Sequence, residues 1–204
     1  PVTTTDELIP SGETGSFRSN PMGLAEFTLS RRVPEYVGKA KAVMNHEKAR
    51  KDGTCPAEVA EAIAKIRTIP GFSEIEEEKI DLSSTIYAVK PGDGSAREQA
   101  ASCQKVLGGW ANIAKGYATK RYRSNLINWG MLPFIYPEDE LPFANDDYIF
   151  IPGIRKAIED KLTDIPAYVV GEEMKPITLK MGELTDDERK IILAGCLINY
   201  YKEA

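Results

Sequence analysis

A strand, a glycine-rich turn and a helix follow one another in the middle of the chain, and this order constrains the fold more than any other feature. Residues 84–89 read Ser-Thr-Ile-Tyr-Ala-Val, the pattern of a buried strand. Pro-Gly-Asp-Gly follows at residues 91–94. Residues 95–107 then have the pattern of a helix that ends at Gly108 and Gly109. Such a unit is typical of sheets that are covered by helices.

The rest of the chain continues to mix strands with helices. We expect a helix at residues 119–129, a terminal helix at residues 185–202, and further strands at residues 111–114, 147–151, 167–170 and 176–181. Thr185 and Glu188 form a capping box at the start of the terminal helix. Because strands alternate with helices in the middle and crowd together near the end, the patterns predict an α/β domain of layered sheets rather than a doubly wound sheet.

The first third of the chain is predicted to be rich in loops. A turn at residues 3–12 leads into a segment that contains Gly and Ser, and a short helix is expected at residues 22–30. A clearer helix is predicted at residues 56–66, because Val59, Ile63 and Ile66 recur at helical spacing. Residues 73–81 are acidic and predict a solvated surface segment.

Length and composition narrow the class of protein. The 204 residues are 42% hydrophobic and 28% charged, an ordinary globular composition that predicts one domain. The net charge of −5 argues against a general binder of nucleic acid or of anionic membranes. No apolar run approaches the ~20 residues that span a bilayer, and no segment resembles a signal peptide. Because the chain starts at Pro1 rather than Met, we expect a piece of a longer protein or a processed one.

The cysteines and the one histidine give little sign of a metal site. Cys55, Cys103 and Cys196 are widely spaced, without a Cys-x-x-Cys pair. This usage does not make a disulfide framework and fits a reducing, cytoplasmic location. Ligands of iron–sulfur clusters usually include a closely spaced pair, so we expect no cluster on this chain. His46 has no neighbours in the sequence that would complete a catalytic triad.

The turn between the central strand and helix could carry chemistry. A glycine-rich turn before a helix presents backbone N–H groups to an anion. Ser95 would stand at the start of the helix, and Arg97 offers a fork for a carboxylate or phosphate. Alternatively, Ser95 and Glu98 form a capping box, and Ser95 only satisfies the N–H groups of its helix. The turn lacks the Gly-Lys-Ser/Thr of a P-loop, and Arg97 replaces the third glycine of the dinucleotide fingerprint.

Short motifs along the chain form an ordered set. They are Thr-Thr-Asp-Glu-Leu-Ile-Pro-Ser-Gly at residues 4–12, Phe-Arg at 17–18, Gly-Ser-Ala-Arg-Glu at 94–98, Ser-Asn-Leu at 124–126, Gly-Met-Leu-Pro at 130–133 and Ala-Gly-Cys-Leu-Ile-Asn at 194–199. In this order, they resemble motifs of the swivelling C-terminal domain of the aconitase superfamily, which the small subunit of isopropylmalate isomerase shares. The matches run from about residue 3 to about residue 203, and residues 19–83 are matched least.

The resemblance implies a fold and a reaction. The fold would be the α/β swivelling domain of β/β/α type, with layered sheets flanked by helices, over residues 1–204. The family's enzymes are hydro-lyases, which dehydrate a hydroxy di- or tricarboxylic acid such as citrate to an alkene and rehydrate it. Their [4Fe-4S] cluster is held by other domains. We therefore expect this chain to bind no cluster and to be inactive alone.

The resemblance also implies a catalytic role for the turn. Ser95 matches the family's base, which takes a proton from the carbon next to a carboxylate. Arg97 matches an arginine that binds a substrate carboxylate. A free hydroxyl is far too weakly acidic to serve as a base, so its alkoxide would need stabilisation by the helix N-terminus and by Arg97. Gly94 and Ala96 would belong to the same substrate-binding turn.

Two residues of the opening third are implied in the site as well. Arg18 matches a second arginine that binds substrate. Asp6 matches an aspartate that we expect to support Arg97 or Ser95; alternatively, it forms an Asx turn.

The chain departs from the family pattern at three positions. Ala96 stands where a second serine is usual, which removes one hydroxyl donor to the substrate. Gln99 and Glu7 each stand where histidine is usual, and Glu7 would add negative charge near a site for polyanions. These changes put citrate in doubt as the substrate but leave the hydratase class intact.

Two other interpretations remain open. One is a stand-alone small subunit of the isopropylmalate isomerase type, with a separate large partner chain. The other is an RNA-binding role, since residues 115–123 interleave basic and aromatic residues. The alternative for that segment is a solvated helix face, which the acidic net charge favours.

Overall fold

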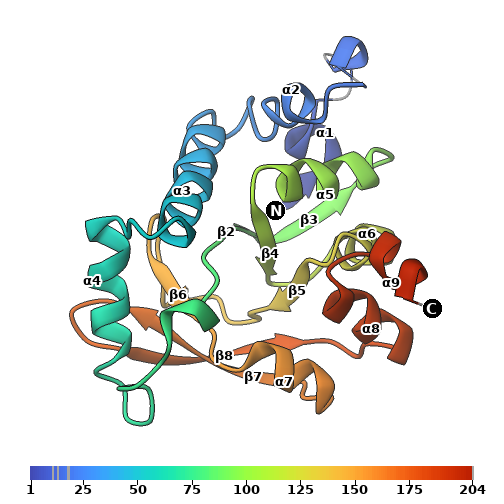
Figure 1. Ribbon diagram of the computed structural model, residues 1–204. Helices are drawn as coiled ribbons and strands as arrows, with labels where there is room; N and C mark the ends of the chain where they lie inside the picture. The colour runs from blue at the N-terminus through green and yellow to red at the C-terminus, as the bar shows by residue number, and fades with distance from the viewer. Residues whose placement is uncertain (11, 13, 18, 204) are drawn as a thin grey trace.

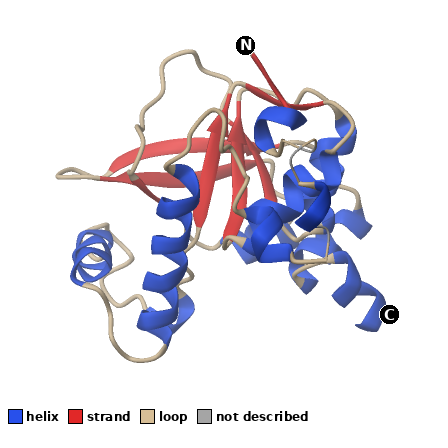
Figure 2. Cartoon of the chain, turned by 90° about the horizontal axis from the view of Figure 1, so that it is seen from above, coloured by secondary structure: helices blue, strands red, loops and turns tan. Residues whose placement is uncertain are grey.

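The computed structural model describes every residue except 11, 13, 18 and 204, and it has a mixed sheet with helices around it (Figures 1 and 2). The strands, in sheet order, are β2 (Ser84–Ala88), β4 (Gly109–Ala114), β5 (Leu132–Ile135), β8 (Lys175–Met181), β7 (Asp164–Val170) and β6 (Tyr148–Phe150). β2, β4 and β5 are parallel, whereas β8, β7 and β6 run antiparallel to their neighbours. The predicted α/β class with layered sheets flanked by helices is therefore confirmed.

The opening of the chain pairs with the segment that follows β2. Strand β1 (Val2–Thr4) runs parallel to β3 (Lys90–Asp93), and helix α1 (Thr5–Leu8) comes directly after β1. The prediction of a simple turn was therefore wrong in both places. Local sequence favours turns there, and pairing between segments far apart along the chain overrides that preference.

The first third is more helical than the sequence predicts. Its helices are α2 (Pro21–Ala25), α3 (Tyr36–Lys51) and α4 (Ala57–Ile66), with short 3-10 turns η1 (Gly15–Phe17) and η2 (Glu77–Lys79). The predicted helix at residues 56–66 is confirmed as α4, whereas α2 is shorter than predicted. Helix α3 was missed, and Ala40 is its buried residue, so its sequence carries no apolar stripe for recognition.

The remaining helices lie around the sheet, with α5, α6, α8 and α9 at the right of Figure 1. They are α5 (Arg97–Val106), α6 (Lys120–Asn128), α7 (Ile154–Glu159), α8 (Asp186–Ala194) and α9 (Leu197–Glu203). The predicted terminal helix is broken at Gly195, whose φ of 94° ends α8. The capping box at its start is confirmed, because Thr185 N–H donates to Glu188 Oε1 at 3.0 Å and Glu188 N–H donates to Thr185 Oγ1 at 3.1 Å. Among the described residues, no helix has the length and apolar character needed to cross a membrane.

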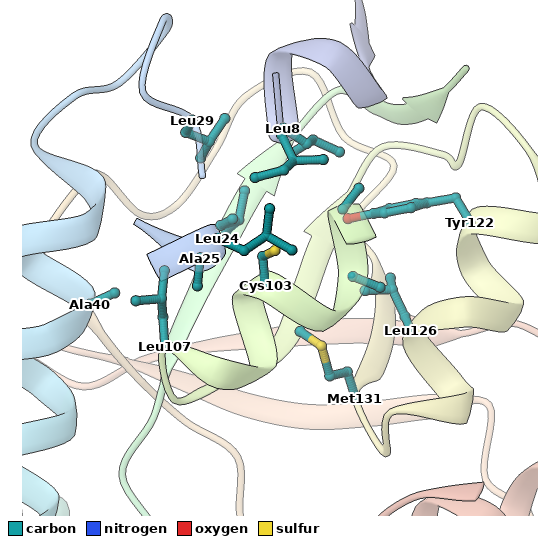
Figure 3. Packing of buried hydrophobic residues seen from close by; sticks show 14 residues of the cluster. Leu8, Leu24, Ala25, Leu29, Ala40, Cys103, Leu107, Tyr122, Leu126 and Met131 are labelled. Atoms are coloured by element: carbon teal, nitrogen blue, oxygen red, sulfur yellow. The ribbon is translucent and has the colours of Figure 1, made fainter. Parts of the chain in front are cut away.

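Buried apolar side chains gather on both sides of α6. One cluster joins α1, α2, α3, α5 and α6, and Figure 3 shows Leu8, Cys103, Tyr122 and Leu126 within it. The other cluster lies between β4, β5, β7, β8, α7 and α8 and includes Phe134, Ile165 and Leu179. The first cluster carries the turn at residues 92–97, because α5 begins at that turn and packs within the cluster.

Candidate active site

Two glycines shape the turn between β3 and α5. Gly92 has a φ of 103° and Gly94 a φ of 132°, values that side-chain-bearing residues rarely adopt. A Cβ at Gly92 would lie 2.3 Å from Tyr122 Cγ, and one at Gly94 would lie 2.1 Å from Thr5 Oγ1. Both positions therefore need glycine for conformation and for space.

The chain's opening is held against this turn. Thr4 in β1 is paired with Asp93 in β3, and Thr4 is also the N-cap of α1. Thr4 and Glu7 form a capping box, in which Thr4 N–H donates to Glu7 Oε2 at 2.7 Å and Glu7 N–H donates to Thr4 Oγ1 at 3.2 Å. Motifs at residues 4–12 and 94–98 thus meet in space although they are far apart in sequence.

Ser95 is exposed in the turn and does not cap α5. The helix begins at Arg97, and its N-cap is Ala96, which makes no side-chain capping bond. The structure records no hydrogen bond of the Ser95 hydroxyl within the described part of the chain, so the capping-box alternative for Ser95 is wrong. Glu98 explains why, since its Oε1 accepts a hydrogen bond from Trp129 Nε1 at 3.2 Å instead.

Arg97 is half-buried, and its Nε is fully buried without a hydrogen-bond partner among the described residues. Arg97 also forms no salt bridge within the described ranges. A buried guanidinium nitrogen normally has an acceptor. The first turn of α5 therefore holds a cationic group whose Nε has no acceptor among the described residues.

Acidic residues of α1 pair with arginines that follow α2. Asp6 Oδ2 accepts from Arg31 Nη1 at 2.9 Å, and Glu7 Oε1 lies 3.1 Å from Arg32 Nε. The resemblance led us to expect that Asp6 supports Arg97 or Ser95, whereas Asp6 contacts Arg31. No Asx turn is needed to explain Asp6. The charge of Glu7 is engaged by Arg32 and by the capping box.

The arginine pair at residues 31–32 was missed in the sequence. Its one signal is the Arg-Arg doublet after the predicted short helix, which has no motif match. Arg18, the other expected substrate-binding arginine, lies outside the described residues. What the structure does bring together is the turn that carries Ser95 and the start of α1, since Gly94 lies against Thr5.

The described residues do not fit an iron–sulfur cluster. They contain no group of three or more His, Cys, Asp or Glu side chains placed to hold a metal ion. Cys103 is 2% exposed in α5, where burial raises its pKa to about 11. Cys196 lies between α8 and α9 and is half-buried.

The basic and aromatic segment at residues 115–123 does not form a stacking platform. Tyr122 is fully buried, and Tyr117 packs against the same cluster and donates from its hydroxyl to Phe134 O at 2.9 Å. Lys115 forms a salt bridge with Asp139, and Arg123 contacts Glu188. The rings that would stack on bases are in the core, so the segment offers no support for RNA binding.

Two hollows lie away from the turn. One of about 680 Å³ lies between the segment after β5 and the β7–β8 hairpin, and one of about 500 Å³ lies at the tip of that hairpin. Neither is lined by Ser95 or Arg97. Ser95 is exposed at the turn and lies outside both hollows.

Fold and turn together define an α/β domain with an exposed serine and an unpaired arginine at the start of a helix. A family model described as the aconitase C-terminal domain matches residues 72–139, which include this turn. The small subunit of the methanogen homoaconitase from Methanocaldococcus jannaschii is 36% identical over 134 residues, which are 65% of this chain and 70% of that protein. The chain belongs to the aconitase superfamily.

Two further comparisons concern a longer relative and the fold. Aconitate hydratase A of Rickettsia bellii is 30% identical over 129 residues, which are 60% of this chain and 14% of that much longer protein. The crystal structure of 3-isopropylmalate dehydratase from Methanocaldococcus jannaschii matches the fold with a TM-score of 0.50 and 22% identity. That match covers 99% of this chain and 91% of the other.

Proposed function

We propose that this chain is the substrate-binding and catalytic-serine part of an aconitase-type hydro-lyase. Ser95 would take the proton from the carbon next to a substrate carboxylate. Arg97 would bind that carboxylate, with Arg18 as a second contact, and the substrate would be a hydroxy di- or tricarboxylic acid. The named relatives, a homoaconitase small subunit and an aconitate hydratase, support this reaction class.

The observation that carries the proposal is the state of the turn. Ser95 is exposed, and the buried Nε of Arg97 has no partner among the described residues. Side chains with a purely structural role would make hydrogen bonds within the protein, as Glu98 does with Trp129. A substrate carboxylate would pair with the positive charge of the Arg97 guanidinium, and the same charge would favour the alkoxide form of Ser95.

Charge around the turn favours a substrate with several carboxylates. Arg31 and Arg32 lie on the side of α1, where exposed pairs with Asp6 and Glu7 hold them. Such exposed pairs are weak and can be exchanged for a substrate anion. Ala96 removes one hydroxyl donor, so the substrate would differ from citrate in the group that the family's second serine contacts.

Water-moving chemistry in this family needs the [4Fe-4S] cluster, which the described residues of this chain do not fit. The cluster would come from a partner in the same cell compartment. That partner is either further domains of the same polypeptide, with residues 1–204 as its swivelling domain, or a separate large subunit. The homoaconitase relative is a small subunit, which supports the second arrangement.

Substitution of the serine in the complete enzyme tests the proposal. Ser95→Ala should abolish hydration of aconitate or dehydration of 3-isopropylmalate, whichever the wild type turns over. Ser73→Ala, at an exposed loop position away from the turn, is the matched control and should leave the rate unchanged. Normal turnover by Ser95→Ala would remove Ser95 from the mechanism.

The size of the native polypeptide decides which partner applies. An immunoblot of denatured source-cell extract that shows a band several-fold larger than 22.6 kDa would mean a domain of a longer enzyme. A band near 22.6 kDa would mean a separate subunit, and an iron–sulfur chain should then co-purify with it.

A further inference from the structure

Beneath the turn lies a closed ring of hydrogen bonds between three buried polar side chains. Gln104 Nε2 donates to Tyr122 Oη at 2.9 Å, Tyr122 Oη donates to Asn112 Oδ1 at 2.6 Å, and Asn112 Nδ2 donates to Gln104 Oε1 at 2.6 Å. Gln104 and Asn112 are each 1% exposed, and Tyr122 is 0% exposed. The ring joins α5, β4 and α6, the elements that surround the turn.

Every donor of the ring is used. The second N–H of Gln104 donates to Ala100 O at 2.8 Å, and the second N–H of Asn112 donates to Ala111 O at 2.9 Å. Turning either amide over would place donor against donor or acceptor against acceptor, so the ring has one arrangement. Burial keeps the Tyr122 hydroxyl protonated by raising its pKa well above the usual range, and the hydroxyl therefore stays a donor.

The ring is in direct contact with the turn through Tyr122 and Gly92. The Tyr122 side chain extends from α6 toward α5 (Figure 3). Its Cβ and aromatic carbons occupy the place where a Cβ of Gly92 would be. Gly92 O also accepts a hydrogen bond from Thr119 Oγ1, the N-cap of α6, at 3.0 Å. Gln104 lies on the helix that begins at Arg97. Tyr122 thus contacts Gly92, where the segment that carries Ser95 begins. It also accepts a hydrogen bond from Gln104, on the helix that follows this segment.

We infer that the Gln104–Tyr122–Asn112 ring positions Ser95 and Arg97 for catalysis, with Tyr122 as the main positioning residue. A buried polar network whose members are all hydrogen-bonded makes the core rigid and specifies one arrangement of the elements that it joins. Here the ring sets the distance between α5 and α6 and the height of Gly92 above the sheet. This inference rests on the proposed role of Ser95, and it adds residues that touch neither substrate nor cluster.

The test compares Tyr122→Phe with Ile165→Val, a buried change in the other cluster, at a temperature where both variants are folded. Tyr122→Phe keeps the aromatic ring under Gly92 and removes only the hydroxyl. Amide hydrogen exchange at residues 92–98 should rise in Tyr122→Phe beyond the general increase that Ile165→Val shows. In the complete enzyme, kcat should fall by about tenfold or more, because small misplacements of catalytic groups are costly. KM should change by less than about threefold.

Equal exchange at residues 92–98 in the two variants, or raised exchange with unchanged kcat, would overturn the positioning role. If Tyr122→Phe does not fold, Gln104→Met breaks the ring from α5 with little change in volume, and the same two readouts apply. Ser95→Ala in the same assay separates the two ideas. Loss of turnover in Ser95→Ala together with full activity of Tyr122→Phe would refute the positioning role of the ring and leave the proposed function standing. Full turnover by Ser95→Ala would refute the proposed function, while the exchange comparison would still decide whether the ring orders the turn.

Discussion

Gly94 lies against Thr5 so closely that a Cβ at residue 94 would be 2.1 Å from Thr5 Oγ1. Thr5 is 3% exposed and opens α1, and Gly94 directly precedes Ser95. The contact joins the first residues of the chain to the turn of the candidate active site. Any side chain at position 94 must therefore move α1, the turn or both.

Gly94→Ala should consequently destabilise the fold and disturb the site. The backbone strain of a side chain at a φ of 132° costs about 1–3 kcal/mol, and the clash with Thr5 adds to it. Urea unfolding measures the loss. Gly38→Ala in α3 is the matched control, because nothing lies within 4 Å of its added Cβ and its helix should gain about 0.5–1 kcal/mol. Equal stability of Gly94→Ala and wild type would contradict the close approach.

Elements with strong local patterns could be predicted from the sequence. The strand at residues 84–89, the helix at residues 119–129 and the capping box at Thr185 all occur close to where they were expected. Strand β5 was missed because Pro133 lies within it, and proline is rare in the interior of a sheet. Pairing of β1 with β3 was missed because it depends on contacts between distant segments, which no local pattern encodes.

The candidate site, like the fold, could be predicted only where the local sequence pattern is strong. Ser95 and Arg97 stand out because glycines and a helix start surround them in the sequence. The Ser-x-x-Glu pattern of a capping box fails here because Glu98 bonds to Trp129, a residue from α6's C-terminal end. The partners of Asp6 and Glu7 come from the Arg31-Arg32 doublet and depend on how the segment after α2 packs against α1.

Removing the charge of Glu7 should tighten binding of an anionic substrate. Glu7→Gln keeps an oxygen that accepts from Thr4 N–H, so the capping box persists and stability should change by less than about 1 kcal/mol. Loss of the carboxylate frees Arg32 and removes repulsion, so KM should fall in the complete enzyme. Glu188→Gln makes the same change in the other capping box and should leave KM as it is. An unchanged or higher KM in Glu7→Gln would show that the charge of Glu7 does not weaken substrate binding.

Arg97→Lys should impair both substrate binding and turnover, with little loss of stability. Lysine retains the charge but lacks the planar fork that binds a carboxylate through two parallel hydrogen bonds. KM should therefore rise, and kcat should fall because the Ser95 alkoxide loses part of its stabilisation. Arg121→Lys, at an exposed position of α6, is the control and should behave like wild type. Unaltered kinetics in Arg97→Lys would mean that the buried Nε serves packing alone.

Cys103 should make stability depend on pH in the alkaline range. Burial raises the pKa of this thiol from 9.0 to about 11, so the native state holds its proton more tightly than the unfolded state. The contribution of Cys103 is fully present below pH 9, where the thiol is protonated in both states. It is lost as pH rises from about 9 to about 11, because the unfolded state then gains from deprotonation first. The loss should be about 3 kcal/mol once the thiol is ionised in both states, since one pKa unit corresponds to about 1.4 kcal/mol.

Urea unfolding of wild type and Cys103→Ala at several pH values between 8 and 11 isolates this effect. The variant should be less stable at pH 8, because a buried side chain is shortened, but its stability should fall less steeply with pH. Tyrosine titrations are common to both proteins and cancel in the difference between the two curves. Parallel curves would show that the Cys103 thiolate meets no greater penalty in the folded protein than in the unfolded chain. Convergence of the curves toward pH 11 is the expected result, and it would establish that α5 keeps this thiol dry beneath the turn that carries Ser95.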